Sequence, residues 1–441
     1  MSSKFDIVVQ PESQVFWDAW GKNHFNFTTL LCEFIDNSVS NFLGNPKIPN
    51  KNVNIKLKLI EKEKLEVTIE DNGAGIKDFS DAFSPGKKPG MSDSFLNEHG
   101  FGLKNALATA NPKNDIWEVY SRQKKDFDSG YVCLVKAPWK MTFGKNKFTG
   151  ERKKMKWPGI YNSSGTFIKF TCPKKLFDTV SPRSKKFDRN TIYLHEEISV
   201  IYRPFLKDIS ITIEDIDHEG RKTERKCVEI YPNSPWNEDE RKIKSKGFKF
   251  FDNFQNPTSF YVNNKKVEVN CTFYKYENNP ECKKRYKYYK HNVSSQGVEI
   301  RTNGRLISYP VFEEIWSKVP DNYYNLFWGV IDIKGDPDFL PATSTTKTGF
   351  LKDDPLYEKI IEDISEAFPS KFIPKTSDNR KKKTKPQEKE RRQEWLEKLM
   401  KFEKIKTSRG EVAVYRELNL EKIISLDALL FDDNDKVVLV E

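Results

Sequence analysis

Glu33 and Asn37 lie four positions apart in the segment EFIDNS, within a stretch whose apolar spacing predicts a helix. Residues four apart on a helix project from the same face, so a carboxylate and an amide oxygen would point the same way. A carboxylate can act as a general base, and an amide oxygen is a hard ligand of the kind that Mg²⁺ prefers. The alternative is an ordinary polar helix face, which this pair alone does not exclude.

A second motif, EDNGAGI, spans residues 70–76 and follows the alternating strand pattern LEVTI. An aspartate held at a strand end by a tight glycine turn, here Asp71, can accept a hydrogen bond from an adenine amino group. Gly73 and Gly75 would let the backbone approach a flat base closely. The competing interpretation is a common Asp-Asn-Gly turn.

The third motif, NEHGFGLKN, spans residues 97–105. Gly100 and Gly102 open a predicted helix, whose free N–H groups and dipole can face phosphates, and Lys104 adds a full positive charge. Glycine at a helix start is common, so this motif is weak by itself. The fourth motif is Gly165-Thr166 at the start of a strand, where the threonine hydroxyl could support Asp71.

The elements that must position these motifs follow from apolar spacing and breakers. A helix over Phe16–Leu43 should end at Gly44 and Pro46. Further expected elements are strands at 53–57 and 65–69, a helix from Gly102 to Asn111, strands at 117–121, 131–136 and 165–170, a helix at 190–205, a strand at 209–213 and an amphipathic helix at 355–368.

Composition bounds the protein class. The 441 residues are sufficient for two or three domains at roughly 100–200 residues each. The net charge of +11 and the pI near 9.0 favour a polyanionic partner. The six cysteines form no C-x-x-C pair, so a zinc site is not expected. Without a signal peptide or a long apolar run, we expect no membrane partner and a cytoplasmic protein, with the nucleus also open.

Together and in this order, the four motifs resemble the GHKL superfamily, which includes the gyrase B subunit, the large heat-shock chaperone, histidine kinases and MutL. The resemblance implies an α+β fold, with a Bergerat-type layered α/β sandwich around a mixed sheet. It implies ATP and Mg²⁺ as cofactors. The implied roles are these: Glu33 polarises the attacking water, Asn37 binds Mg²⁺, Asp71 binds adenine with Thr166 nearby, Gly73 and Gly75 shape the base pocket, and Gly100, Gly102 and Lys104 hold phosphates in a lid.

Within that superfamily the chain most resembles the Microrchidia (MORC) branch. The GFGLKN sequence that contains Lys104 is similar to the MORC lid, with residues 83–95 as its mobile part. The segment DFLPATSTTKTGF at 338–350 resembles the MORC loop that carries a γ-phosphate sensor, which makes Lys347 the candidate. GVEIRTNGR at 297–305 resembles the strand before it. This second region would be a ribosomal-protein-like βαβ transducer domain.

The expected domains are therefore an ATP-binding domain at 1–185, a transducer at 186–375, a charged linker or helix at 376–405 and a small β segment at 406–441. The resemblance implies ATP-gated homodimerisation, with a lysine that couples nucleotide state to domain angle. It also strengthens an interpretation of three basic runs, at 152–156, 241–246 and 283–290, as contacts to double-stranded DNA. Tyrosines in the third run could stack on bases; solvated loops are the alternative.

The favoured function is a slowly hydrolysing, MORC-like ATPase that clamps DNA. A chaperone-like clamp on protein clients and a nucleotide sensor without turnover remain alternatives. A histidine kinase is not favoured, since the five histidines are isolated. In the tail, Asp427 and Glu441 could fill the first two positions of a PD-(D/E)xK nuclease module, but the lysine that should follow is absent. A plain β hairpin is the other interpretation.

Overall fold

The computed structural model describes residues 13–22, 25–84, 101–140, 150–181, 184–232, 248–250, 259–262, 264–276, 287–290, 292–344, 346–370 and 373 of the first compact unit, Met1–Lys375. In the second unit, Thr376–Glu441, it describes the backbone of four strands. The two units are described separately below. The charged run at 376–392 lies outside the described residues.

One large mixed sheet organises the first half of the chain. Its described strands run in the order β5-β4-β3-β6-β2-β1-β7-β8, and all neighbours are antiparallel except β1 and β7. The strands are β1 (Lys51–Glu61), β2 (Lys64–Asp71), β3 (Trp117–Arg122), β4 (Tyr131–Lys136), β5 (Glu151–Lys154), β6 (Gly165–Pro173), β7 (Ile209–Ile216) and β8 (Lys222–Lys226). Because β2 ends at Asp71 and pairs with β6 in the register Asp71↔Thr166, two predicted motifs meet there.

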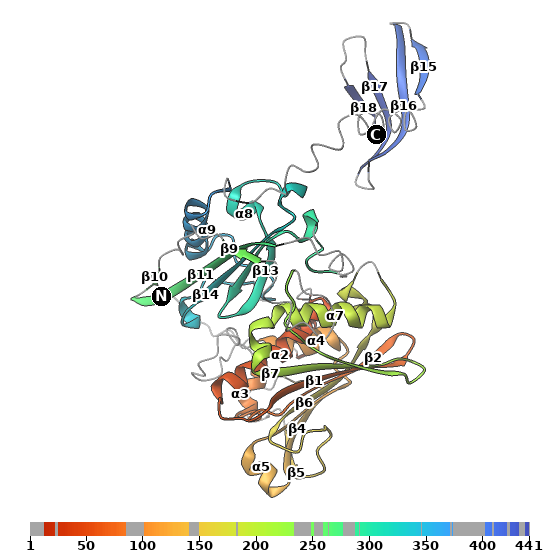
Figure 1. Ribbon diagram of the computed structural model, residues 1–441. Helices are drawn as coiled ribbons and strands as arrows, with labels where there is room; N and C mark the ends of the chain where they lie inside the picture. Colours follow the sequence, from red (N-terminus) through yellow and green to blue (C-terminus); the bar gives the residue numbers. More distant parts are fainter. Residues whose placement is uncertain are drawn as a thin grey trace, which may run out of the picture. The chain divides into compact units, whose positions relative to one another are not determined.

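Helices cover one face of this sheet (Figure 1). The main ones are α1 (Ser13–Gly21), α2 (Phe27–Gly44), α4 (Gly102–Ala110) and α7 (Phe187–Ile201). Alternate residues of the central strands, such as Val53, Ile55 and Leu57 on β1, are fully buried against them. Shorter helices are α3 (Phe79–Phe83), α5 (Lys124–Ser129), α6 (Lys174–Phe177), η1 (Asp178–Val180) and η2 (Arg203–Lys207).

A second mixed sheet follows within the same compact unit. Its described order is β10-β11-β14-β12-β13, with β9 paired to β11 and with β12 parallel to β14. The elements are β9 (Phe248–Phe250), β10 (Phe260–Val262), β11 (Lys265–Tyr276), η5 (Val293–Ser295), β12 (Gly297–Thr302), β13 (Arg305–Val311), α8 (Glu313–Trp316), η6 (Asn322–Tyr324), β14 (Phe327–Lys334), η7 (Pro337–Phe339) and α9 (Pro355–Ala367). Its core packs against α8 and α9, and a separate cluster with Val200, Ile230 and Trp328 joins it to α7.

The second unit contains an antiparallel meander of β15 (Phe402–Thr407), β16 (Gly410–Leu420), β17 (Ile424–Phe431) and β18 (Val437–Val440). Asp427 lies on β17, whose ladder with β18 ends at the pair Ala428 and Val440. Glu441 lies outside the described residues, so the nuclease interpretation stays a prediction.

The predicted α+β class and layered sandwich around a mixed sheet are confirmed. The single helix predicted over Phe16–Leu43 is wrong, because the chain forms α1 and α2 separately. Asn26 caps α2, accepting a hydrogen bond from the Thr29 N–H at 2.8 Å, so the sequence restarts the helix there. The predicted domain limits stay predictions; α7, β7 and β8 pack with the first sheet. Among the described residues no helix is long and apolar enough to cross a membrane.

Candidate functional site

Helix α2 brings a row of polar side chains to one region of the first sheet. Glu33 and Asp36 are buried on it, and Asn37 is half-buried one turn beyond Glu33. Apolar residues such as Phe34 and Ile35 are also buried, so α2 is enclosed on most of its circumference. Buried charges on a helix need compensating partners, so the groups that contact these side chains indicate the role of this face of α2.

The carboxylate of Glu33 lies against the first residue of α4. A Cβ atom added to Gly102 would come within 2.0 Å of Glu33 Oε2, so a side chain at this position would require the Glu33 carboxylate to move. The first N–H groups of a helix lack intrahelical partners and carry partial positive charge. Glu33 is therefore placed where a general base could work next to an anionic group bound at the start of α4.

Asp71 forms a second buried site at the end of β2. Its Oδ1 accepts hydrogen bonds from the Gly73 N–H at 2.9 Å and the Thr166 N–H at 3.3 Å, and its Oδ2 accepts from the Ser38 hydroxyl at 2.9 Å. Burial raises the pKa of Asp71 to about 6, since these neutral donors offset only part of the desolvation. Thr166 thus supports Asp71 through its backbone, whereas the sequence suggested its hydroxyl.

The glycine turn after Asp71 is braced by Asn41, one further turn along α2. Asn41 Oδ1 accepts from the Ala74 N–H at 2.7 Å, and Asn41 Nδ2 donates to the Gly75 carbonyl at 3.3 Å. Gly75 has φ +78°, and a Cβ there would lie 2.6 Å from the Arg122 carbonyl oxygen. Only glycine fits such a turn, so α2 and β3 together fix the loop beside Asp71.

The predicted phosphate-binding residues are only partly described. Gly100 and residues 85–100 as a whole lie outside the described residues. Lys104 is buried on α4, and its ammonium donates to the Ala82 carbonyl at 2.8 Å, in α3 just before that segment. Burial lowers the pKa of Lys104 to about 8. The phosphate contact proposed for Lys104 stays a prediction.

Lys347 reaches α2 from the loop after β14, and its role as a γ-phosphate sensor stays a prediction. Its ammonium contacts Asp36 Oδ2 at 3.1 Å, and Arg305 Nε and the Tyr202 hydroxyl donate to Asp36 Oδ1 at 2.9 and 2.6 Å. Burial opposes ionisation of Asp36, but the charges of Arg305 and Lys347 outweigh it and hold its pKa below the usual value. Helix α2 therefore presents Glu33 and the Lys347 contact within one turn of each other.

A metal ion at this site would be held mainly by phosphate and water oxygens, with few protein side chains. In the described part of the chain, no group of three His, Cys, Asp or Glu side chains is placed to hold an ion. Mg²⁺ often uses one or two protein oxygens together with phosphate and water. The half-buried amide of Asn37, beside Glu33, fits that pattern, so the residues present are compatible with a nucleotide-bound Mg²⁺.

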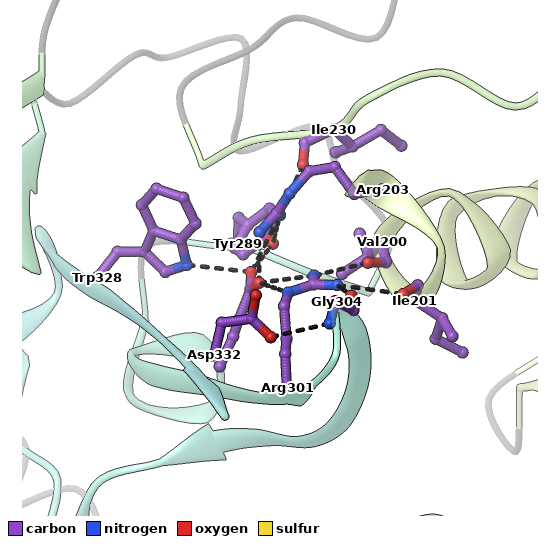
Figure 2. A network of polar contacts seen from close by, with 10 residues as sticks. Val200, Ile201, Arg203, Ile230, Tyr289, Arg301, Gly304, Trp328 and Asp332 are labelled. Atoms are coloured by element: carbon purple, nitrogen blue, oxygen red, sulfur yellow. Dashed lines mark hydrogen bonds and ion pairs between the residues drawn. The ribbon is translucent and has the colours of Figure 1, made fainter. Parts of the chain in front are cut away.

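A buried polar network links the second sheet to α7 (Figure 2). Glu299 on β12 accepts from Arg203, Arg301, Tyr289 and the Trp328 indole. Arg301 also donates to the carbonyls of Val200 at 2.8 Å and Ile201 at 3.1 Å, at the end of α7. A cation on the free carbonyls of a helix end is favourable, so this network ties the two sheets together next to α2.

Sequence reasoning missed Ser38, Asn41, Asp36, Arg305 and Tyr202. Asp36 and Ser38 stood inside the first motif, and Arg305 ended the GVEIRTNGR segment, so their positions were visible. Their partners were not, because Asp36 and Arg305 are 269 residues apart.

The three basic runs that were predicted to contact DNA differ in what their described residues contact. On the exposed strand β5, Arg152 pairs with Asp126 at 2.9 Å and lies over the Tyr131 ring, and Lys153 pairs with Glu151 at 2.8 Å. The run at 241–246 lies outside the described residues.

In the third run, the expectation of base stacking is wrong for Tyr289. Its ring is buried and its hydroxyl bonds Glu299, because it completes the network that joins the sheets. Tyr288 stacks on Tyr309 at 5.6 Å between ring centroids.

The solved structures that are similar to this chain include the following two. The crystal structure of the N-terminal domain of a DNA repair protein covers 79% of this chain and 95% of its own, with 14% identity and a TM-score of 0.48. The B subunit of the DNA gyrase from Myxococcus xanthus covers 77% of this chain and 88% of its own, with 11% identity and a TM-score of 0.40. No family model matches the sequence. No curated protein matches it either. A functional assignment therefore depends on the residues and their geometry.

Proposed function

We propose that this protein binds ATP in a GHKL-type, Bergerat pocket on the first sheet and hydrolyses it slowly. The observation that carries the proposal is the arrangement along α2. Glu33 faces the start of α4 at one point, and Ser38 and Asn41 hold the Asp71 turn at the other. A base-binding acceptor and a general base on one rigid helix suit a ligand with adenine at one end and phosphates at the other.

The residues would divide the work as follows. The Asp71 carboxylate accepts from the adenine amino group, and the turn with Gly73 and Gly75 lies against the base. The start of α4 at Gly102, with Gly100 and Lys104, holds phosphates. Glu33 takes a proton from the attacking water.

Two further groups act at the phosphates. Bound Mg²⁺, held by Asn37 and the phosphate oxygens, would neutralise phosphate charge. Lys347 offers its ammonium to the γ-phosphate as negative charge develops there.

At a finer level we propose a MORC-like clamp, in which ATP closes a homodimer around double-stranded DNA. The net charge of +11 and the exposed basic strand β5 support a polyanionic partner. The motif order and the Lys347 contact to α2 support an ATP-gated mechanism. A nuclease module or partner is suggested only by the tail residues Asp427 and Glu441.

The test is ATP turnover by the wild type and by Glu33→Ala, each with and without double-stranded DNA. Loss of a general base should lower kcat by about 10²–10⁴-fold with ATP binding retained. Glu61→Ala is a matched control, because Glu61 is exposed on β1 and pairs with the exposed Lys64. Equal rates in wild type and Glu33→Ala would remove Glu33 as the base.

The partner is decided by the same assay and by sedimentation. Turnover raised by DNA, and a dimer formed with a non-hydrolysable ATP analogue, are the expected results. Turnover that ignores DNA but rises with unfolded protein would favour a clamp on protein clients. Tight ATP binding without turnover would favour a nucleotide sensor.

A further inference from the structure

Asp36 is the buried carboxylate that receives Lys347, and nothing in the proposed chemistry requires it. We propose that Asp36 is a positioning residue: it holds the Lys347 ammonium beside Glu33 before nucleotide binds, so that the lysine reaches the γ-phosphate by a local movement of its own loop. This inference rests on the ATPase function proposed above. On this proposal the Lys347 ammonium moves a short distance from Asp36 to the γ-phosphate. The second sheet as a whole does not have to swing toward α2.

The geometry of Asp36 suits a holding role. The side chain is 1% exposed, and its two oxygens divide their donors. Oδ1 is occupied by Tyr202 and Arg305, which fixes the carboxylate, whereas Oδ2 faces Lys347 at 3.1 Å. A fixed, desolvated carboxylate binds an ammonium strongly because little water competes for it.

Arg305 holds the other end of the same lysine. Its Nε contacts Asp36, and its terminal nitrogen donates to the Lys347 backbone carbonyl at 3.2 Å. Lys347 itself has φ +51°, a left-handed conformation that a non-glycine residue adopts only when its surroundings impose it. Both the backbone and the tip of Lys347 are therefore set by residues around α2.

The second sheet has little freedom to swing toward α2. Arg301, on the β12–β13 hairpin that also carries Arg305, is bonded to the end of α7 (Figure 2). Glu299 on β12 is paired with Arg203. Breaking one buried pair leaves an uncompensated charge, which is strongly destabilising. The joint between the sheets is thus stiff on the hairpin side.

The loop that carries Lys347 lies outside the strands of the second sheet. It is closed at its base by hydrogen bonds from the Leu351 N–H to the Ala342 carbonyl and from the Ser344 N–H to the Gly349 carbonyl, both at 2.9 Å. Within the loop that these two hydrogen bonds close, Thr348 is exposed. A side chain on such a loop can change partner without moving the sheet beneath it.

The charges around Lys347 are balanced before nucleotide binds. Two carboxylates, Glu33 and Asp36, face two cations, Arg305 and Lys347. Burial opposes the charged form of Lys347, but the nearby Glu33 and Asp36 carboxylates outweigh it and raise its pKa. A triphosphate adds negative charge next to this group, which gives the ammonium a second partner within the same site.

The experiment is a double-mutant cycle with Asp36→Asn and Lys347→Met in the full chain. ATP turnover and the unfolding free energy are measured for the wild type, both single variants and the double variant. Each single change should lower kcat about tenfold or more, with the KM for ATP changed less than kcat. The double variant should be no slower than Lys347→Met alone, and its loss of stability should be smaller than the sum of the single losses.

Asp215→Asn is the matched control, since Asp215 is a buried carboxylate that pairs with Arg225 at the β7–β8 edge. Its effects should add to those of Lys347→Met. If Asp36→Asn does not fold, it is combined with Arg305→Met, which removes both buried charges. This combined variant then takes the place of Asp36→Asn in the cycle with Lys347→Met.

Additive losses of kcat for Asp36 and Lys347 would overturn the positioning role, even if the unfolding cycle shows coupling, because the pair would then be only structural. Additive losses in both measurements would show that the pair is not formed. A wild type that neither binds nor hydrolyses ATP would sink the proposed function and the positioning role with it. The unfolding cycle would then still report the ion pair alone, so the two failures are distinguishable.

Discussion

Asp71 and Glu299 are both buried carboxylates, yet their surroundings differ in kind. Asp71 is held by one hydroxyl and two backbone N–H groups, and burial raises its pKa to about 6. Glu299 is also opposed by burial, but Arg203 and Arg301 outweigh it and lower its pKa to about 2. Neutral donors leave a carboxylate with unsatisfied capacity to accept, whereas guanidinium groups saturate it.

The difference indicates two uses of buried charge. The Asp71 site is incomplete by itself and is suited to a ligand that brings a further donor. The Glu299 network is complete and serves to fix α7 against the second sheet. Asp36 has features of both sites. Arg305 binds one oxygen of its carboxylate, and the Lys347 ammonium, which we propose to move, binds the other. The predictions below test this contrast.

The largest effect is expected for Glu299, whose carboxylate is paired with two arginines. Glu299→Gln should lower the unfolding free energy by about 3–5 kcal/mol, because Arg203 and Arg301 would stay buried without their counter-charge. Urea denaturation measures this, with Glu61→Gln as an exposed control that should change little. A loss below about 1 kcal/mol would mean that the network does not depend on the charge.

A smaller loss is expected in the turn beside Asp71. Gly75→Ala should cost about 2–4 kcal/mol, because alanine would be strained at φ +78° and its Cβ would meet the Arg122 carbonyl. Gly130→Ala separates the two causes, since Gly130 has φ +71°, but among the described residues no atom beyond its chain neighbours lies within 4 Å of an added Cβ. Equal losses of unfolding free energy in the two variants would show that backbone strain, and not the contact with the Arg122 carbonyl, causes the loss.

Asp71→Asn should stabilise the fold while it removes ATP binding. A carboxyl whose folded pKa is raised contributes stability that is present below about pH 4 and is lost as the pH rises through about 6. At pH 8 the amide should therefore be more stable than the carboxylate by up to about 3 kcal/mol. Chemical denaturation at pH 5 and pH 8 measures the gain, which should shrink at the lower pH.

The same titration predicts how the wild type binds ATP. Affinity should fall as the pH is lowered through about 6, because protonated Asp71 is a poorer acceptor for adenine. GTP, which lacks the amino group at that position, provides the comparison ligand. Affinity for ATP that is constant between pH 7 and pH 5 would contradict the role of Asp71.

The smallest effect is expected at the solvent-exposed pair on β5. Glu151→Gln removes the partner of Lys153, but both side chains are about half exposed, so water replaces the lost contact. Unfolding curves of the variant and the wild type should coincide. A clear destabilisation would mean that the surface pairs of this protein behave like its buried ones.

The sequence by itself determined the local chemistry of the site. The spacing of Glu33 and Asn37 on a helix, the strand that ends at Asp71 and the helix start at Gly102 depend only on short-range periodicity and turn preferences. The structure places Glu33 and Asn37 on helix α2, Asp71 at the end of β2 and Gly102 at the start of α4. It also confirms the α+β class that the resemblance to the GHKL superfamily implied.

Only the tertiary structure decided which charges meet. Asp36 lies 311 residues from Lys347 and 269 from Arg305, and no local pattern encodes such a pairing. The same applies to Glu299 with Arg203 and to the burial of Tyr289 within a run that looked solvent-exposed. Buried charge is stable only where packing brings its partner within contact distance, so these assignments depend on how the two sheets pack around α2 and α7.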